Sequence, residues 1–236
     1  CSSGLQAVEG GIDSSHISFL HRNLADFAPS ASRSLHSRYA GGRGATFEVD
    51  ETDYGLRIAA RREAEADSYY WRVTQFLLPF YTMIPPILQN TPDSHLSPFG
   101  GHAWVPIDDE NTWTWSFGAH PNGRYEGERG HGGAWGPIDA QYRPLLNRDN
   151  EYKIDREKQK TRSFTGIEGI PNQDAAVQES MGTIVDRTQE HLGHSDRGIA
   201  AFRRLLINLA KDLRAGSPPE AARHGSPMGF RREAPA

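Results

Sequence analysis

The chain has 236 residues, a formal net charge of −4 and a pI near 6.2. This charge gives no general attraction for nucleic acid or for a membrane surface, and no run of about 18 apolar residues predicts a transmembrane helix. The length suits one domain with a sizeable core. Its single cysteine rules out an intramolecular disulfide, and we therefore expect a cytoplasmic protein.

A short apolar segment near the start of the chain carries one carboxylate and two imidazoles. Residues 5–22 are predicted to form a helix, with Asp13 and His16 on one of its faces. His21 fits this helix less well, because five residues at about 100° each place it about 140° around the axis from His16. Either His21 lies beyond the last regular turn, or the segment contains a π-bulge.

The middle of the chain has the alternating pattern of a mainly antiparallel sheet. The expected strands cover residues 46–50, 54–62, 68–77, 101–107 and 112–118. In the last of these, Trp113, Trp115 and Phe117 alternate with small polar residues and so share one face. We expect this aromatic face to pack in the core; as the alternative, it lines a cavity.

The end of the chain contains a long amphipathic helix between Ser195 and Arg214. Apolar residues recur there at helical spacing, with Ser195 as the expected N-cap and Gly216 as the stop. We expect residues 1–216 to form one domain. Residues 217–236 are rich in Pro, Arg and Ala and have little to bury, so a disordered tail is predicted.

Two imidazoles do not complete a metal site, so a third ligand has to come from elsewhere in the chain. Asp174 stands near the start of a predicted helix among small apolar residues and is our candidate. Two histidines and one carboxylate on one face, with the opposite face open, form the site of non-haem Fe(II) proteins that activate oxygen. Alternatively, His16 and His21 are ordinary partly buried histidines and Asp174 is a helix N-cap. The residues alone leave both interpretations open.

Three stretches of the chain resemble, in the same order, the α subunits of the Rieske non-haem iron oxygenases. The likeness is closest to the phthalate-dioxygenase-like branch, which includes aryl-ether O-demethylases. The stretches are residues 5–21, which contain EGGIDSSHISFLH, residues 69–85 and residues 172–193. The resemblance implies an α+β fold of the helix-grip (START-like) type, in which an antiparallel sheet wraps around the long C-terminal helix. It also implies an oxidoreductase that uses O2 to hydroxylate or O-demethylate an aromatic substrate, which we expect to be acidic.

By this resemblance His16, His21 and Asp174 bind a mononuclear Fe(II). Asp13 is then a bridging carboxylate that passes electrons to the iron from the cluster of a neighbouring subunit. An ionised carboxylate can accept a hydrogen bond from His16 on one side and from a cluster-ligand histidine on the other, which agrees with that role. The resemblance further implies a ring of subunits, most simply a homotrimer, and an NAD(P)H-dependent reductase as electron donor. Glu9, where many members of the wider superfamily have Asn, is interpreted as a group behind the ligands or a surface residue.

The electron-delivering cluster cannot be held by this chain. A Rieske [2Fe–2S] cluster needs two cysteines and two histidines, and the sequence contains only Cys1. We therefore expect a piece of a longer protein whose cluster domain precedes it, able to bind iron but without turnover of its own. Two rival functions remain: a helix-grip module that binds an apolar ligand without redox activity, and a zinc hydrolase.

An acidic substrate would need a cation in its pocket. Arg57, Arg61 and Arg72 lie on expected strands, and alternation places Arg57 and Arg61 on the same face. A surface position is the alternative for each arginine. His102, beside the aromatic strand, is a candidate for substrate contact, with a structural role as its alternative.

Overall fold

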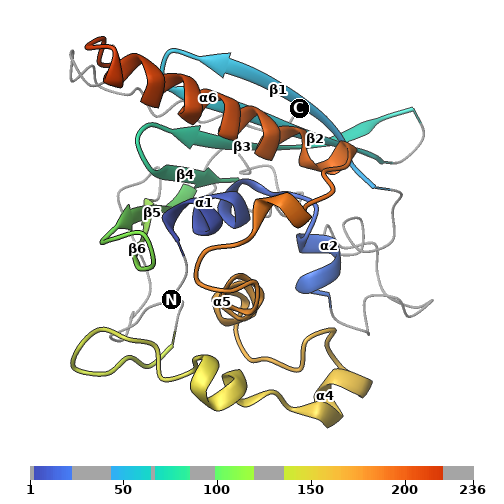
Figure 1. Ribbon diagram of the computed structural model, residues 1–236. Coiled ribbons are helices and arrows are strands. Elements are labelled where there is room, and N and C mark those ends of the chain that lie inside the picture. The colour runs from blue at the N-terminus through green and yellow to red at the C-terminus, as the bar shows by residue number, and fades with distance from the viewer. Residues whose placement is uncertain (1–2, 23–43, 65–66, 86–98, 120–135, 220–236) are drawn as a thin grey trace.

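The computed structural model describes residues 3–22, 44–64, 67–85, 99–119 and 136–219 (Figure 1). Its sheet is antiparallel, and its six strands lie side by side in chain order. They are β1 (Thr46–Thr52), β2 (Gly55–Glu63), β3 (Tyr69–Leu77), β4 (Tyr81–Ile84), β5 (Phe99–Pro106) and β6 (Thr112–Ala119). The predicted α+β fold is confirmed, and β4 is a strand that the sequence pattern did not predict.

Helices stand at both ends of the described chain. They are α1 (Gly4–Ile12), α2 (Ile17–Leu20), α4 (Arg156–Thr161), α5 (Ile170–Ser180) and α6 (Arg197–Arg214). Short 3-10 segments complete the set: η4 (Arg148–Lys153), η5 (Arg187–Gln189) and η6 (His194–Asp196). Among the described helices, none has both the length and the apolar character needed to cross a membrane.

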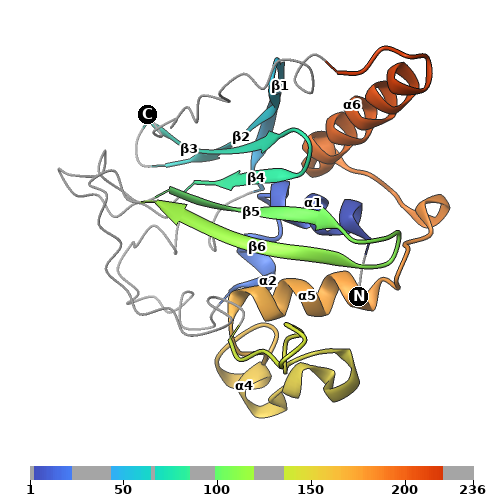
Figure 2. The ribbon, with the colours of Figure 1, turned by 90° about the vertical axis from the view of Figure 1, so that its left-hand side faces the viewer.

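Two helices pack against the sheet. The long helix α6 packs on β1 and β2, while α1 packs on β3, β4 and β5, with α5 on the other side of α1 (Figures 1 and 2). Phe202 of α6 meets Phe76 of β3 edge to face, with 4.8 Å between the ring centroids. The helix-grip arrangement is therefore confirmed with one difference: α1, as well as the C-terminal helix, lies against the sheet.

Two consecutive glycines let α1 fit between α5 and the sheet. A Cβ on Gly10 would lie 2.3 Å from Nε2 of Gln178 in α5, and one on Gly11 would lie 3.0 Å from Nε1 of Trp104 in β5. A larger residue at either position would require the Gln178 amide, or the Trp104 and Thr82 side chains, to shift. The last residue of α1, Ile12, is almost completely buried, and Asp13 follows it at the wall of a pocket.

Two expectations about helix ends are wrong. The segment predicted as one helix is two helices, with Asp13 as the C-cap of α1 and His16 as the N-cap of α2. Asp13 and His16 therefore do not share a helix face, and no π-bulge is present in this described segment. Helix α6 is capped by Asp196 rather than Ser195, although it ends before Gly216 as expected.

The aromatic face of β6 does not pack in the core. Trp113 and Trp115 are 38% and 59% exposed, and they stack on one another with 5.7 Å between the ring centroids. Tyr142 lies beside Trp113. The opposite face of β6 carries Ser116, whose hydroxyl contacts His102 of β5. The two tryptophans point to the face of the sheet opposite to that of Trp104, which lies against α1, and this explains their exposure.

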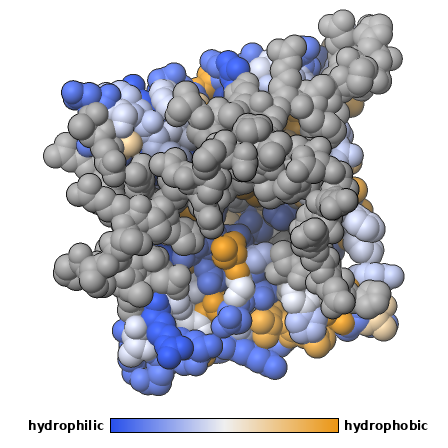
Figure 3. Space-filling view, turned by 180° about the vertical axis from the view of Figure 1, so that it is seen from behind, coloured by the Kyte–Doolittle hydropathy of each residue, from blue (hydrophilic) through white to orange (hydrophobic). Residues whose placement is uncertain are grey.

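Figure 3 shows the molecule from the side opposite to that of Figure 1. Among the described residues visible there, hydrophilic ones gather at the lower left and hydrophobic ones at the centre and lower right. The predicted disordered tail, beyond residue 219, lies outside the described residues.

Candidate metal centre

His16, His21 and Asp174 converge as predicted. They are one described group of metal-ligand type, with ligand atoms all within 4.8 Å of one another. Oδ1 of Asp174 lies 3.5 Å from Nε2 of His16 and 3.2 Å from Nε2 of His21. The two imidazole centroids are 5.1 Å apart and the ring planes are nearly perpendicular, at 83°. Two imidazole nitrogens and a carboxylate oxygen directed at one point form a donor set that fits mononuclear Fe(II).

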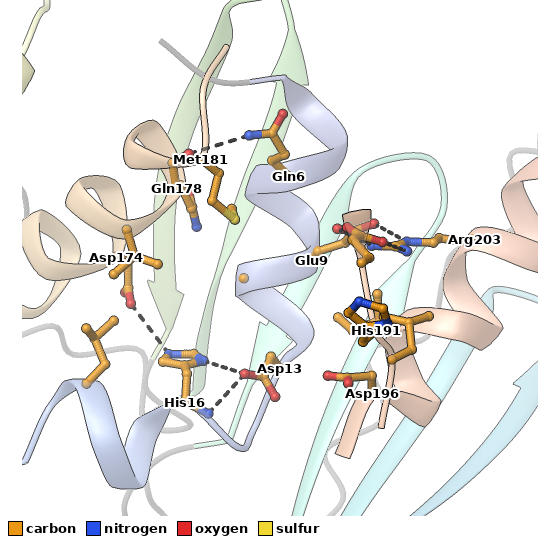
Figure 4. Close-up of a pocket in the computed structure, with 16 residues that line it drawn as sticks. Gln6, Glu9, Asp13, His16, Asp174, Gln178, Met181, His191, Asp196 and Arg203 are labelled. Atoms are coloured by element: carbon orange, nitrogen blue, oxygen red, sulfur yellow. Dashed lines mark hydrogen bonds and ion pairs between the residues drawn. The ribbon is translucent and has the colours of Figure 1, made fainter. Parts of the chain in front are cut away.

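His21 lies beyond the last regular turn of α2, which is the first of the two alternatives expected for it. His16 is the N-cap of this four-residue helix and has a helical backbone, whereas His21 is its C-cap, with φ −92° and ψ 12°. Asp174 approaches from α5, and Figure 4 shows it facing His16 across the gap between the two helices. Chain segments far apart in the sequence thus supply the three candidate ligands.

Asp13 organises the break and orients one ligand. Its Oδ1 accepts a hydrogen bond from the Ser15 amide at 2.7 Å, and its Oδ2 accepts one from the His16 amide at 2.9 Å. Oδ2 is also 3.1 Å from Nδ1 of His16. Because an ionised carboxylate only accepts, this contact makes Nδ1 the donor and leaves Nε2 of His16 free of a proton in the neutral ring.

The charge of Asp13 is held by its neighbours. Burial raises the pKa of Asp13, but hydrogen bonds from His16 and Ser15 and the charge of His16 together lower it below its usual value. Asp13 is therefore ionised at neutral pH, and its side chain remains 22% exposed beside the candidate metal site.

His21 has a different partner. Its Nδ1 lies 2.8 Å from Oε1 of Gln173, the residue directly before Asp174. Burial lowers the pKa of His21, but hydrogen bonds to Asp174 and Gln173 and the Asp174 charge raise it above its usual value. The sequence patterns did not single out Gln173; its position next to Asp174 was the signal that could have found it.

Glu9 has a role that neither interpretation of it foresaw. Its carboxylate accepts hydrogen bonds from Arg187 at 2.7 Å and from Arg203 of α6 at 2.8 and 3.1 Å. Glu190 pairs with the same two arginines. The four residues form a charged cluster that ties α1, one turn before Asp13, to α6 and to the segment around η5. Figure 4 shows Glu9 and Arg203 of this cluster.

A pocket of about 320 Å³ opens between α1, α5 and the segment that precedes α6. Asp13, His16 and Asp174 line it, so one side of the candidate metal site is reachable from this pocket (Figure 4). The rest of its wall is both charged and apolar. It includes Glu190, His191, Asp196, Val177, Met181 and Leu192.

The three candidate arginines have different surroundings. Arg57 forms a surface ion pair with Asp50, 2.6 Å between Nη2 and Oδ2, so the surface interpretation holds for it. The Arg61 guanidinium lies over the ring of Tyr69, 4.6 Å from its centroid. Arg72 is 5% exposed, donates to the Pro85 carbonyl at 3.2 Å, and its charge acts on His21. Of the three, Arg72 is the one whose charge acts on a candidate ligand.

His102 also lies on the metal side of the sheet. Its Nδ1 is 3.1 Å from the Ser116 hydroxyl, and its ring packs against Trp104 with 5.1 Å between the centroids. Burial lowers the pKa of His102, against an opposing effect of the Asp174 charge. His102 is thus a neutral histidine near Asp174, held by protein partners.

Comparisons with known proteins match nearly the whole chain. The family model described as "LigXa C-terminal domain like" matches residues 2–224. The chain is 36% identical over 226 residues to the phthalate 4,5-dioxygenase oxygenase subunit of Pseudomonas putida, covering 89% of the chain and 49% of that protein. It is 34% identical over 241 residues to the 3-chlorobenzoate-3,4-dioxygenase oxygenase subunit of Comamonas testosteroni, covering 91% of the chain and 51% of that protein.

A third relative matches the chain over a shorter stretch. The chain is 42% identical over 52 residues to the 5,5'-dehydrodivanillate O-demethylase oxygenase subunit of a Sphingobium strain, covering 22% of the chain and 12% of that protein. The chain spans about half the length of the first two relatives. These matches confirm the resemblance to the oxygenase subunits of aromatic dioxygenases, and the chain belongs to the LigXa C-terminal-domain-like family.

Proposed function

We propose that this chain is the mononuclear iron part of an oxygenase that hydroxylates or O-demethylates an aromatic acid. The observation that carries the proposal is the convergence of His16, His21 and Asp174, with ligand atoms within 4.8 Å of one another. Oxygenase subunits among the relatives support the reaction class. Fe(II) held by this triad on one face would have open positions on the other and would supply activation of O2.

Asp13 is the proposed entry point for electrons. Its Oδ2 contacts Nδ1 of His16, while part of its side chain faces the pocket. The imidazole N–H of a cluster ligand on another subunit could donate to this carboxylate from the pocket side. We propose that a Rieske [2Fe–2S] cluster in the complete protein docks there, that an NAD(P)H-dependent reductase supplies it, and that the subunits form a ring, most simply a homotrimer.

Arg72 is the proposed partner of the substrate carboxylate. It is buried, and its positive charge acts on His21, one of the proposed iron ligands. Arg57 is committed to Asp50 on the surface and offers no such position. If Arg72 binds the carboxylate, Arg72→Lys raises KM for an aromatic acid far more than it changes kcat, because a bidentate contact is lost.

The central test separates iron binding from electron delivery. In the complete protein, assayed with its reductase, Asp13→Asn should retain iron and lose turnover. The amide oxygen can keep both contacts with His16, while its NH2 group cannot accept from Ser15, so we expect a stability loss of about 1–3 kcal/mol. Retained turnover at wild-type rates would refute the electron-delivery role.

Metal analysis of the purified protein tests the site itself. Iron should bind with a stoichiometry of one per chain, and His16→Ala, His21→Ala and Asp174→Ala should each abolish it. Full occupancy by zinc with hydrolytic activity would favour a hydrolase. Absence of any metal, together with binding of an apolar ligand, would favour a helix-grip binding module.

A further inference from the structure

We infer that Gln173 is a positioning residue that fixes which nitrogen of His21 faces the metal. The inference rests on the proposed iron site, but concerns a residue that would not touch the iron. Its basis is a chain of two hydrogen bonds that starts at a backbone carbonyl and ends at the His21 ring.

The first bond fixes the orientation of the Gln173 amide. Nε2 of Gln173 donates to the backbone carbonyl of Ile167 at 2.9 Å. A carbonyl oxygen only accepts, so the NH2 group must lie on that side and Oε1 must lie on the other. The oxygen is the atom that faces His21, at 2.8 Å from Nδ1.

The second bond then fixes the His21 tautomer. Because Oε1 only accepts, Nδ1 of His21 must carry the proton. In the neutral ring Nε2 is left with its lone pair, and Nε2 is the atom that lies 3.2 Å from Oδ1 of Asp174. The ring is therefore prepared to bind a metal through Nε2, the arrangement that an outer hydrogen bond commonly enforces on a ligand histidine.

Burial makes the arrangement costly to lose. The His21 side chain is 7% exposed and Gln173 is 8% exposed, so water has little access to replace the amide. Without it, the Nδ1–H of His21 would be buried without an acceptor. Gln173 and Asp174 are consecutive in α5, so one turn of this helix supplies both a candidate ligand and the group that orients another.

The two histidines differ in the charge of their partners. Nδ1 of His16 faces the carboxylate of Asp13, whereas Nδ1 of His21 faces a neutral amide. A carboxylate partner makes an imidazole a more strongly donating ligand than an amide partner does. Gln173→Glu would make the two ligands alike, while keeping an oxygen that accepts from His21.

Three variants test the inference. Gln173→Leu removes both hydrogen bonds, and Gln173→Glu keeps the acceptor for His21. Asn172→Leu is the matched control, because Asn172 is also a buried amide of α5 that donates to a backbone carbonyl, that of Glu168 at 2.9 Å. It reproduces the loss of a helix-anchoring bond without touching His21.

Iron affinity, measured by competition with a chelator under anaerobic conditions, is the first readout. We expect Gln173→Leu to weaken binding by about 10–100-fold. Gln173→Glu should restore affinity to within a few-fold of wild type, with a lower reduction potential of the bound iron. Asn172→Leu should bind as wild type does. Equal loss of iron in Asn172→Leu and Gln173→Leu would overturn the inference, because the effect would then be structural.

The second readout reports the proton directly. In zinc-loaded protein with ¹⁵N-labelled histidine, NMR should show a slowly exchanging Nδ1–H on both His16 and His21. Gln173→Leu should remove the His21 signal and leave that of His16, which serves as the internal control. An unchanged His21 signal in a folded Gln173→Leu protein would refute the inference. If the wild-type protein binds neither iron nor zinc at these residues, the proposed function fails instead.

Discussion

Replacing Glu9 by glutamine should destabilise the chain by about 2–4 kcal/mol. Glu9 accepts three hydrogen bonds from two guanidinium groups, those of Arg187 and Arg203. A hydrogen bond to a charged group contributes about 1.5–3 kcal/mol, so three set an upper limit of about 4.5–9 kcal/mol. Glutamine keeps one acceptor oxygen, and both arginines keep Glu190, so less than half of that limit should be lost.

Partial exposure lowers the expected loss further. The side chains of Glu9, Arg203 and Arg187 expose 13%, 24% and 32% of their surface, and solvent screens such pairs. At about 2–4 °C per kcal/mol, the melting temperature should fall by about 4–16 °C.

The assay is urea unfolding followed by circular dichroism, with the midpoint and the m-value fitted together. Asp50→Asn is the control, because the Asp50–Arg57 pair is more exposed, at 59% and 40%, and should contribute at most about 0.5 kcal/mol. A Glu9→Gln loss no larger than that of Asp50→Asn would refute the reasoning, since the cluster would then behave as an ordinary surface pair.

Three further predictions follow from the same geometry. Gly11→Ala should cost about 1–3 kcal/mol in unfolding free energy, because its Cβ would lie 3.0–3.1 Å from Trp104 and Thr82. Gly44→Ala is the control, because a Cβ there has open space and should leave stability unchanged. Equal effects of the two variants would contradict the close packing of α1. The hydrogen bond from Arg203 lowers the pKa of Glu190 below 4.5. The stability that ionised Glu190 contributes is therefore present above pH 4.5 and is lost as pH falls through the lowered pKa. Glu190→Gln should flatten the acid limb of the plot of unfolding free energy against pH, and an unchanged limb would argue against the pairing. Fe(II) at 100 times its Kd should raise the unfolding free energy by about 2.7 kcal/mol, and this gain should be absent in His21→Ala.

The sequence pattern and the family resemblance together predicted the three candidate ligands, and alternation predicted most of the sheet. His16, His21 and Asp174 meet as expected, and the alternating residues of β1, β2, β3, β5 and β6 define those strands within a few positions. Strand β4 was missed because four residues between prolines are too few to establish a period.

The start of the chain shows where periodicity misleads. A helical pattern continues through Asp13, but its carboxylate accepts hydrogen bonds from the Ser15 and His16 amides, and this local pairing competes with a continuous helix. The pattern of apolar residues records no such competition. Two histidines five positions apart nevertheless face one carboxylate, with His21 just past the end of α2, where the regular helix has stopped.

Other features depend on contacts that local spacing does not contain. Glu9 and Arg203 are 194 positions apart, so their ion pair cannot be inferred from either segment alone. Alternation placed Trp113 and Trp115 on one face of a strand, but it could not show that α1 covers the other face, where Trp104 lies against Gly11.

The separation of the site residues along the chain has a consequence for how the protein matures. Gln173 follows His21 by 152 positions, and Asp174 comes next, so a chain emerging from the ribosome cannot present all three candidate ligands until most of it has been synthesised. Closing so long a loop has a large entropic cost that folding must meet first. Metal loading should therefore be a late event, and once bound, an ion would act as a cross-link that holds the first turns of the chain to its last third.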